Sequence, residues 1–148
     1  MPKFDLKIID SIRGRQVFYQ LTIDDNPDLE GVLEEAIKND KKTGILDQYE
    51  KRLEKKYKKD MVQIYNIMQR VANNEHVPGE KYHECTGRDK NDPNKDYEFK
   101  HGDLRVYAIK THDGKIIVLA GYKNTQKSNI LRMRSIKKQY FESIKNKE

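Results

Sequence analysis

Basic and hydroxyl-bearing side chains concentrate between residues 97 and 128 of the chain. The eight candidates for chemistry are Lys100, His101, Arg105, Tyr107, Tyr122, Lys123, Gln126 and Lys127. Arg and Lys pair with phosphate oxygens, and His, Tyr or Lys can transfer protons when a crowded positive site moves their pKa values. RNA supplies its own nucleophile, the 2′-hydroxyl. Its cleavage therefore needs a base, an acid and cations for the phosphorane charge, all of which this group could provide.

Each of these residues also has an ordinary structural interpretation. In an alternating strand, Arg105 shares a face with Tyr107 and Ile109 and could simply be exposed. The two tyrosines could be sheet residues, and His101 could be a turn residue beside Gly102. The base is left open: Lys100, His101 and Tyr122 are candidates, and Glu98 could also take this role.

The motifs of several other chemistries are missing from the sequence. There is no G-x-S-x-G, and Cys85 lies only two residues from His83, which is not an arrangement that a nucleophile and its base need. There is also no C-x-x-C, H-E-x-x-H, G-x-x-x-x-G-K or G-x-G-x-x-G spacing. We therefore expect neither a metal site nor a cofactor.

The candidates lie on a predicted meander followed by a helix. Alternating runs at 104–110 and 115–121 flank His112-Asp113-Gly114, which predicts a hairpin whose glycine tolerates a positive φ. A shorter strand is predicted at 97–100. After a polar connection at 122–128, a helical period places Ile130, Met133, Ile136, Lys137, Tyr140 and Phe141 on one face.

The preceding part of the chain predicts strands and then helices. Alternation at 4–9 and 17–23 indicates a strand pair, and Asn26-Pro27 begins a predicted helix that ends near Gly44. A stripe from Ile45 to Ala72 predicts one long helix, or a helix broken near 58–60. Residues 73–96 are predicted to be irregular with little core, either as an active-site flap or as a disordered connection.

Composition limits the possible classes of protein. The chain has 148 residues, which predicts a single domain over 1–148 with an elaborated region at about 45–96. A net charge of +6 would attract phosphate backbones. Cys85 is the only cysteine, so an intramolecular disulfide is impossible and a reducing cytoplasm fits. No apolar run approaches ~20 residues and no signal-peptide profile is present, so we expect a soluble, cytoplasmic protein with no membrane partner.

An ordered set of short motifs resembles the RelE/ParE toxin superfamily. The motifs are G-x-x-R-V-Y at 102–107, D-G-K at 113–115, V-L-x-G-Y-K at 118–123 and T-Q-K-S at 125–128, and they are most similar to the HigB-like toxins. The resemblance implies an α+β, RelE-like fold: an antiparallel sheet ending in a three-strand meander, two or three helices packed on it, and a C-terminal helix.

The resemblance also implies roles for particular residues. Arg105 matches the arginine that contacts the scissile phosphate in RelE-like toxins, and Lys123 matches a basic residue that ends the next strand. Gln126 and Lys127 lie in the T-Q-K segment as RNA-binding candidates, with Arg88 in the loop before the meander as a third. The chain departs from the family where the strand before the arginine reads YEFK, with one acid and one lysine, and where a C-terminal tyrosine of the RelE type is missing.

The function implied is that of the toxin of a type II toxin–antitoxin system. Such a toxin would cleave mRNA on the ribosome without a metal, leaving a 2′,3′-cyclic phosphate and a 5′-hydroxyl. Its partners would be mRNA, the ribosome and an antitoxin of helix-turn-helix type. Two alternatives stay open: a ParE-like toxin that inhibits gyrase, and a non-enzymatic binding protein of phage or mobile-element origin that uses residues 45–96 as its interaction surface.

Overall fold

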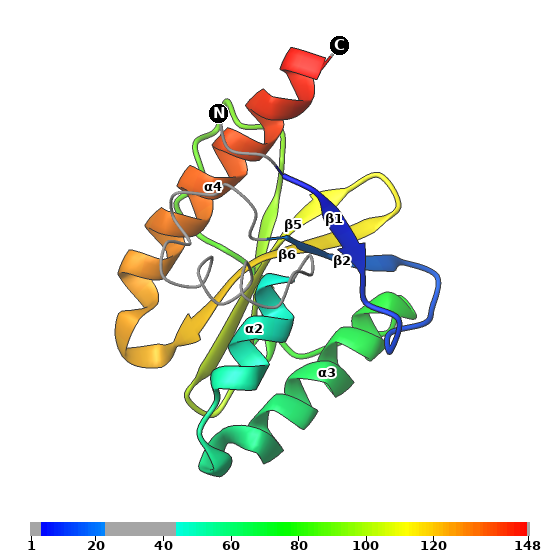
Figure 1. Ribbon diagram of the computed structural model, residues 1–148, viewed down its shortest axis with the longest axis vertical. Helices are drawn as coiled ribbons and strands as arrows, with labels where there is room; N and C mark the ends of the chain where they lie inside the picture. The colour runs from blue at the N-terminus through cyan, green and yellow to red at the C-terminus, as the bar shows by residue number, and fades with distance from the viewer. Residues whose placement is uncertain (1–3, 23–43, 148) are drawn as a thin grey trace, which may run out of the picture.

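A six-stranded sheet forms the centre of the computed structural model, which describes residues 4–22 and 44–147 (Figure 1). The strands are β1 (Leu6–Ile8), β2 (Val17–Leu21), β3 (Tyr82–Glu84), β4 (Asp96–His101), β5 (Leu104–Thr111) and β6 (Gly114–Tyr122). The helices are α2 (Ile45–Arg52), α3 (Lys58–Ala72) and α4 (Gln126–Lys147), with 3₁₀ turns at Lys55–Tyr57 and Lys123–Thr125. The α+β class and the C-terminal helix are confirmed, whereas the helix predicted from Asn26 lies outside the described residues.

The sheet is mixed, and the prediction of an antiparallel sheet was wrong. Its order is β1-β2-β6-β5-β4-β3, and β2 runs parallel to β6 with Val17 opposite Gly114. All the other neighbouring strands are antiparallel, including the predicted N-terminal pair and the predicted meander. The parallel pairing joins strands that are far apart in the sequence, so no turn signal announces it.

The long helical stripe from Ile45 to Ala72 is divided into α2 and α3. The break lies before the predicted position at 58–60, because Leu53 and Glu54 are extended, with ψ values of 136° and 150°. Leu53 is buried at this corner, so the apolar spacing continues while the chain changes direction. A spacing argument cannot detect such a corner, since both helices bury the same stripe.

Helices α3 and α4 cover opposite faces of the sheet (Figure 1). Met61, Ile64 and Met68 of α3 pack with Phe99 and Val106 in one core. The second core contains Met133, Ile136 and Tyr140 of α4, packed on apolar residues of β5 and β6. The predicted apolar face of α4 is therefore confirmed. No described helix is long and apolar enough to cross a bilayer.

The tip of the β5–β6 hairpin needs a glycine for a reason that the sequence did not reveal. Gly114 does not adopt a positive φ, unlike Gly102 in the β4–β5 turn, where φ is 55°. A Cβ on Gly114 would instead collide with the backbone carbonyl of Val17. The glycine permits the close approach of β2 to β6 at the start of their parallel pairing.

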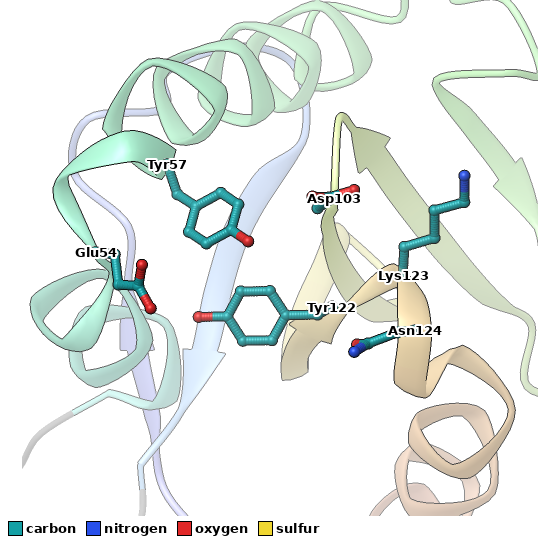
Figure 2. Close-up of a pocket in the computed structure, with 6 residues that line it drawn as sticks. All are labelled: Glu54, Tyr57, Asp103, Tyr122, Lys123 and Asn124. Carbon is teal, nitrogen blue, oxygen red and sulfur yellow. The ribbon is translucent and has the colours of Figure 1, made fainter.

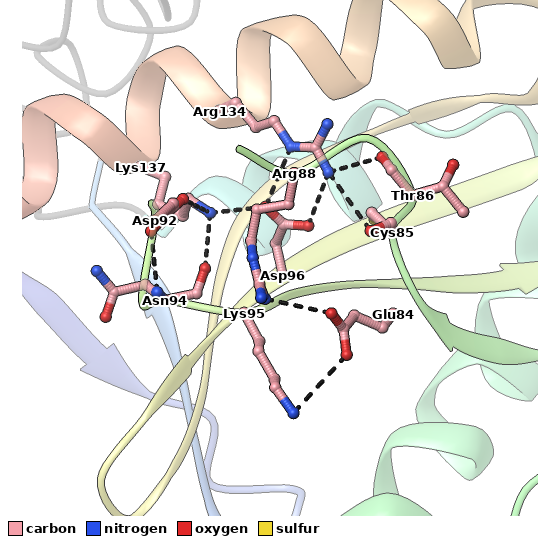
Figure 3. A network of polar contacts seen from close by, with 10 residues as sticks. All are labelled: Glu84, Cys85, Thr86, Arg88, Asp92, Asn94, Lys95, Asp96, Arg134 and Lys137. Atoms are coloured by element: carbon pink, nitrogen blue, oxygen red, sulfur yellow. Dashed lines mark hydrogen bonds and ion pairs between the residues drawn. The ribbon is translucent and has the colours of Figure 1, made fainter. Parts of the chain in front are cut away.

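The segment at 73–96 contributes more to the core than predicted. It contains β3 and buries Val77 and Cys85. It is also tied to α4 by a polar network around Asp96, whose carboxylate accepts from Arg134 and Lys137 (Figure 3). Outside β3 and the first residue of β4 the segment is irregular, as predicted, and ion pairs and hydrogen bonds rather than apolar contacts hold most of it in place.

Candidate active site

Arg105 is a buried cation at the start of β5. It is 7% exposed, and its Nη1 donates to the carbonyls of Gly102 and Leu104, at 2.8 Å each. Its Nε is buried and has no hydrogen-bond partner among the described residues. None of the described carboxylates forms an ion pair with it. The guanidinium therefore has no acidic counter-charge among the described residues, and one of its donors is buried and unpaired.

Lys100 lies beside Arg105 on the face of the sheet that carries α4. The two residues are directly opposite in the β4–β5 register, and Gly121 of β6 completes the row. Side chains of directly opposite residues project from the same face, with Cβ atoms about 5 Å apart. Lys100 is half-buried. The row thus places two cations at one end of the sheet, as a phosphate site requires.

The next row of the same face contains a buried carboxylate. Glu98 is fully buried, and its two oxygens accept from Nε2 of Gln126 at 2.7 and 3.0 Å. Its Oε1 also lies 3.2 Å from Nε2 of His83, whose side chain is 34% exposed. His83 Nδ1 lies 3.0 Å from the Gly79 carbonyl, so both ring nitrogens face acceptors. Glu98 thereby holds and orients an imidazole that reaches the surface.

Tyr107 completes this second row opposite Glu98. Burial, together with the charge of Glu98, raises the pKa of the phenol, while the charge of Arg105 opposes that effect. Its hydroxyl is buried and makes no hydrogen bond of good geometry with a described residue. Tyr107 and Arg105 therefore each leave one polar atom unsatisfied in adjacent rows of a single face.

Two predicted catalytic residues lie on the other face of the sheet. His101 Nε2 is 3.5 Å from Oδ1 of Asp60 in α3, and its Nδ1 is 3.2 Å from Lys81 Nζ. The Tyr122 ring packs against Tyr49 and Tyr57, with centroids 5.9 and 5.5 Å apart. The sheet therefore separates both residues from the row of Arg105 and Lys100.

Tyr122 and Lys123 line a pocket of about 570 Å³ at the end of β6 (Figure 2). Figure 2 shows the Tyr122 hydroxyl directed toward Glu54, whereas the Lys123 amine points away from the two tyrosines of the pocket. Lys123 is exposed, and its backbone N–H donates to the Asp103 carbonyl at 2.8 Å. Lys123 can contribute positive charge near the β4–β5 turn.

The three RNA-binding candidates have different surroundings. Lys127 is exposed in the first turn of α4, where it can contact a ligand. The Gln126 amide is already engaged by Glu98. Arg88 Nη1 lies 3.2 Å from Glu84 Oε2 in a surface ion pair, at one side of the network in Figure 3. Lys127 is thus the candidate with the most accessible charge.

Sequence reasoning did not connect His83 with Glu98. His83 lies in β3, a three-residue strand within a stretch that predicted no regular structure. Its register opposite Glu98 depends on an antiparallel pairing for which no tight turn gives a signal. The sequence did contain one signal for this part of the site. Glu98 and Lys100 are two residues apart in a strand, so both project from the face that carries Arg105.

Among residues 4–22 and 44–147, no three His, Cys, Asp or Glu side chains are grouped so that they could hold a metal ion. The arrangement on the α4 face is instead a pair of cations beside a carboxylate–imidazole pair.

Comparison of the chain with protein-family models, with curated proteins and with solved structures found no match.

Proposed function

We propose that the protein is a RelE-like, metal-independent endoribonuclease whose site is the α4 face of β3, β4 and β5. The observation that carries the proposal is the state of Arg105: a buried guanidinium with no acidic partner among the described residues and with Lys100 directly opposite it in the sheet. A buried charge is costly unless something neutralises it. A phosphodiester at the surface beside Arg105 and Lys100 supplies the negative charge that this pair of cations lacks.

The cations would stabilise the charge that develops during cleavage. Attack of the 2′-hydroxyl on phosphorus gives a phosphorane with more negative charge than the diester, and Arg105 and Lys100 favour this state over the ground state. Cleavage leaves a 2′,3′-cyclic phosphate and a 5′-hydroxyl.

His83 is the best-placed group for proton transfer in this proposal. It is half-exposed, and the buried Glu98 carboxylate orients it, as an acid or base that meets a large substrate requires. Glu98 itself is covered by Gln126 and acts here as a positioning residue. His101 and Tyr122, on the opposite face, have no part in the step.

The setting that we propose is a type II toxin–antitoxin system in the cytosol. The net charge of +6 suits binding to a ribosome, whose RNA surface attracts basic proteins. The motif resemblance at 102–128 supports mRNA as the substrate and a helix-turn-helix antitoxin as the partner that holds the activity in check.

Primer extension on a translated message after brief induction tests the proposal. Wild type should cut at codon-related positions, and blocking translation initiation should abolish the cuts. Arg105→Met keeps much of the side-chain length but removes its charge, and it should lower cleavage at least 10²-fold. Lys90→Met, at an exposed position of the loop before β4, is the control and should cut as wild type. Circular dichroism must show that Arg105→Met is folded. Arg105→Lys keeps the charge without the fork and should retain partial activity.

One observation favours a second candidate, a protein that binds without catalysis. Arg105 already donates to two backbone carbonyls, so the guanidinium could serve only to close the β4–β5 turn. Intact messages with arrested growth and altered DNA supercoiling would indicate a ParE-like gyrase inhibitor. Intact messages with normal growth would indicate a binding protein.

A further inference from the structure

Lys115, at the start of β6, is a buried lysine without an acidic partner. It is 5% exposed, and its Nζ donates to Oε1 of Gln16 at 2.7 Å and lies 5.0 Å from the centre of the Tyr97 ring. No carboxylate of the described residues pairs with it. Burial, together with the neighbouring Lys110, lowers the pKa of Lys115 to about 8. An amide and an aromatic face are weak substitutes for a counter-ion.

Gln16 is held so that its oxygen faces Lys115. Its Nε2 donates to the Val71 carbonyl at 3.0 Å and to Oδ1 of Asn74 at 2.7 Å, and its backbone N–H donates to the Ala72 carbonyl. The amide therefore cannot turn without losing these bonds. The end of α3 thus fixes one acceptor for the ammonium group and leaves its other hydrogens free.

Lys115 lines a pocket of about 410 Å³ that two further cations border. Arg15 and Lys110 are exposed at its rim, and Lys110 is directly opposite Lys115 in the β5–β6 register. Neither forms an ion pair with a described carboxylate. The pocket therefore contains three cations, one of them buried. Asp113 is the one carboxylate among its lining residues.

The acid that borders this pocket is Asp113 in the hairpin turn. Its Oδ2 accepts from the Tyr19 hydroxyl at 2.8 Å, and its Oδ1 is buried without a partner among the described residues. His112 lies 4.0 Å from it and is almost fully exposed. One carboxylate held by a phenol leaves an excess of positive charge from Arg15, Lys110 and Lys115.

We propose that this pocket at the β5–β6 hairpin tip binds a phosphate group. A phosphate can accept from Lys115 within the pocket and from Lys110 and Arg15 at its rim, and it is small enough for the space. The pocket opens on the α3 face of the sheet, so it is distinct from the row of Arg105. The proposal therefore does not depend on the proposed ribonuclease activity. The group could come from a free phosphate ester or from an RNA backbone.

Inorganic phosphate is the first probe, titrated into the full chain at constant ionic strength with sodium chloride as the reference salt. The backbone amide signals of Gln16, Gly114 and Lys115 should shift saturably in ¹H–¹⁵N spectra, whereas chloride should not move them. Lys115→Met should weaken binding at least tenfold and Lys110→Met about threefold. Lys59→Met, on the exposed surface of α3, is the matched control and should bind as wild type. Equal affinity in wild type and Lys115→Met would overturn the proposal.

A 2′-O-methyl RNA oligonucleotide, which the chain cannot cleave, separates the two sources. Shifts at the same three amides and displacement by phosphate would assign the pocket to RNA backbone. Saturation by inorganic phosphate alone would assign it to a free phosphate ester. No saturable shift with either probe would overturn the proposal. Primer extension with Arg105 variants reads a different face, so the two proposals can fail separately.

Discussion

Lys137 of α4 donates to Asp96 of β4 over 2.7 Å, and both side chains are at least 96% buried. Lys137 also bonds to Asp92 at 2.6 Å and to the Asn94 carbonyl at 2.8 Å, while Arg134 contacts the other Asp96 oxygen at 3.2 Å (Figure 3). One buried ammonium therefore holds the 85–96 loop, β4 and α4 together. The same strand presents Glu98 and Lys100 to the candidate site two and four residues later.

Lys137→Met should destabilise the fold by about 3 kcal/mol, because it leaves the buried Asp96 with Arg134 as its one ion-pair partner among the described residues. Urea unfolding followed by circular dichroism measures the change. Lys138→Met, the exposed neighbour, is the control and should lie within about 0.5 kcal/mol of wild type. Equal stability of the two variants would show that this network contributes little.

Lys115 should make stability depend on alkaline pH. Its pKa is about 8 when folded and 10.5 in the reference state, so the unfolded chain holds more protons between these values. Stability should therefore rise with pH across that window, by about 3 kcal/mol for a shift of this size. The buried tyrosines act in the opposite direction near pH 10, so the measured quantity is the difference between wild type and Lys115→Met. A difference that does not vary from pH 7 to 10.5 would contradict the burial of a charged lysine.

Tyr107→Phe should leave the free energy of unfolding unchanged or raise it by up to about 1 kcal/mol, because the hydroxyl is buried without a good partner. Tyr49→Phe is the matched comparison. It removes a 2.8 Å bond to the Gly121 carbonyl and should cost about 1 kcal/mol. Thermal unfolding of both variants checks the contrast.

His83→Gln should slow RNA cleavage by about 10²-fold while changing stability by less than about 0.5 kcal/mol, since the imidazole is half-exposed. His112→Gln, at the exposed hairpin tip, is the control and should cut as wild type. Single-turnover cleavage of a message on stalled ribosomes is the measurement. Unchanged cleavage by His83→Gln across pH 5–8 would remove this residue from the proposed mechanism.

The sequence predicted the elements that have local signals. The meander follows from alternation around His112-Asp113-Gly114, and α4 follows from the helical period that starts at Ile130, although the helix itself begins earlier, at Gln126. The break between α2 and α3 was one of the two alternatives predicted for 45–72, and it lies a few residues before the predicted position. Strand β3 escaped because it has no characteristic turn, and the parallel β2–β6 pair escaped because its partners are remote in sequence.

The candidate site was predicted in part. Alternation placed Arg105 and Tyr107 on one face, and Lys100 and Glu98 were already candidates; the structure places these two on the same face and adds His83. Alternation could not reveal that Arg105 is buried or that His101 and Tyr122 lie on the α3 face of the sheet. Burial and face both depend on which side of the sheet each helix covers. The pocket of Lys115 was missed for a related reason. A lysine in an alternating strand is expected to be exposed, and the sequence does not show that Gln16 and the Tyr97 ring pack against it.

The parallel pairing of β2 with β6 also determines the order in which the molecule can fold. Hydrogen bonds between residues 17–20 and 114–117 cannot form until most of the described chain has been synthesised. Until then, the β1–β2 pair has no further strand beside it, and Phe18, which is fully buried in the folded protein, is not positioned against its core partner Phe99. Contacts of such long sequence separation slow folding. If translation stalls before β6 has emerged, the β1–β2 pair of the nascent chain would therefore stay exposed to chaperones and proteases.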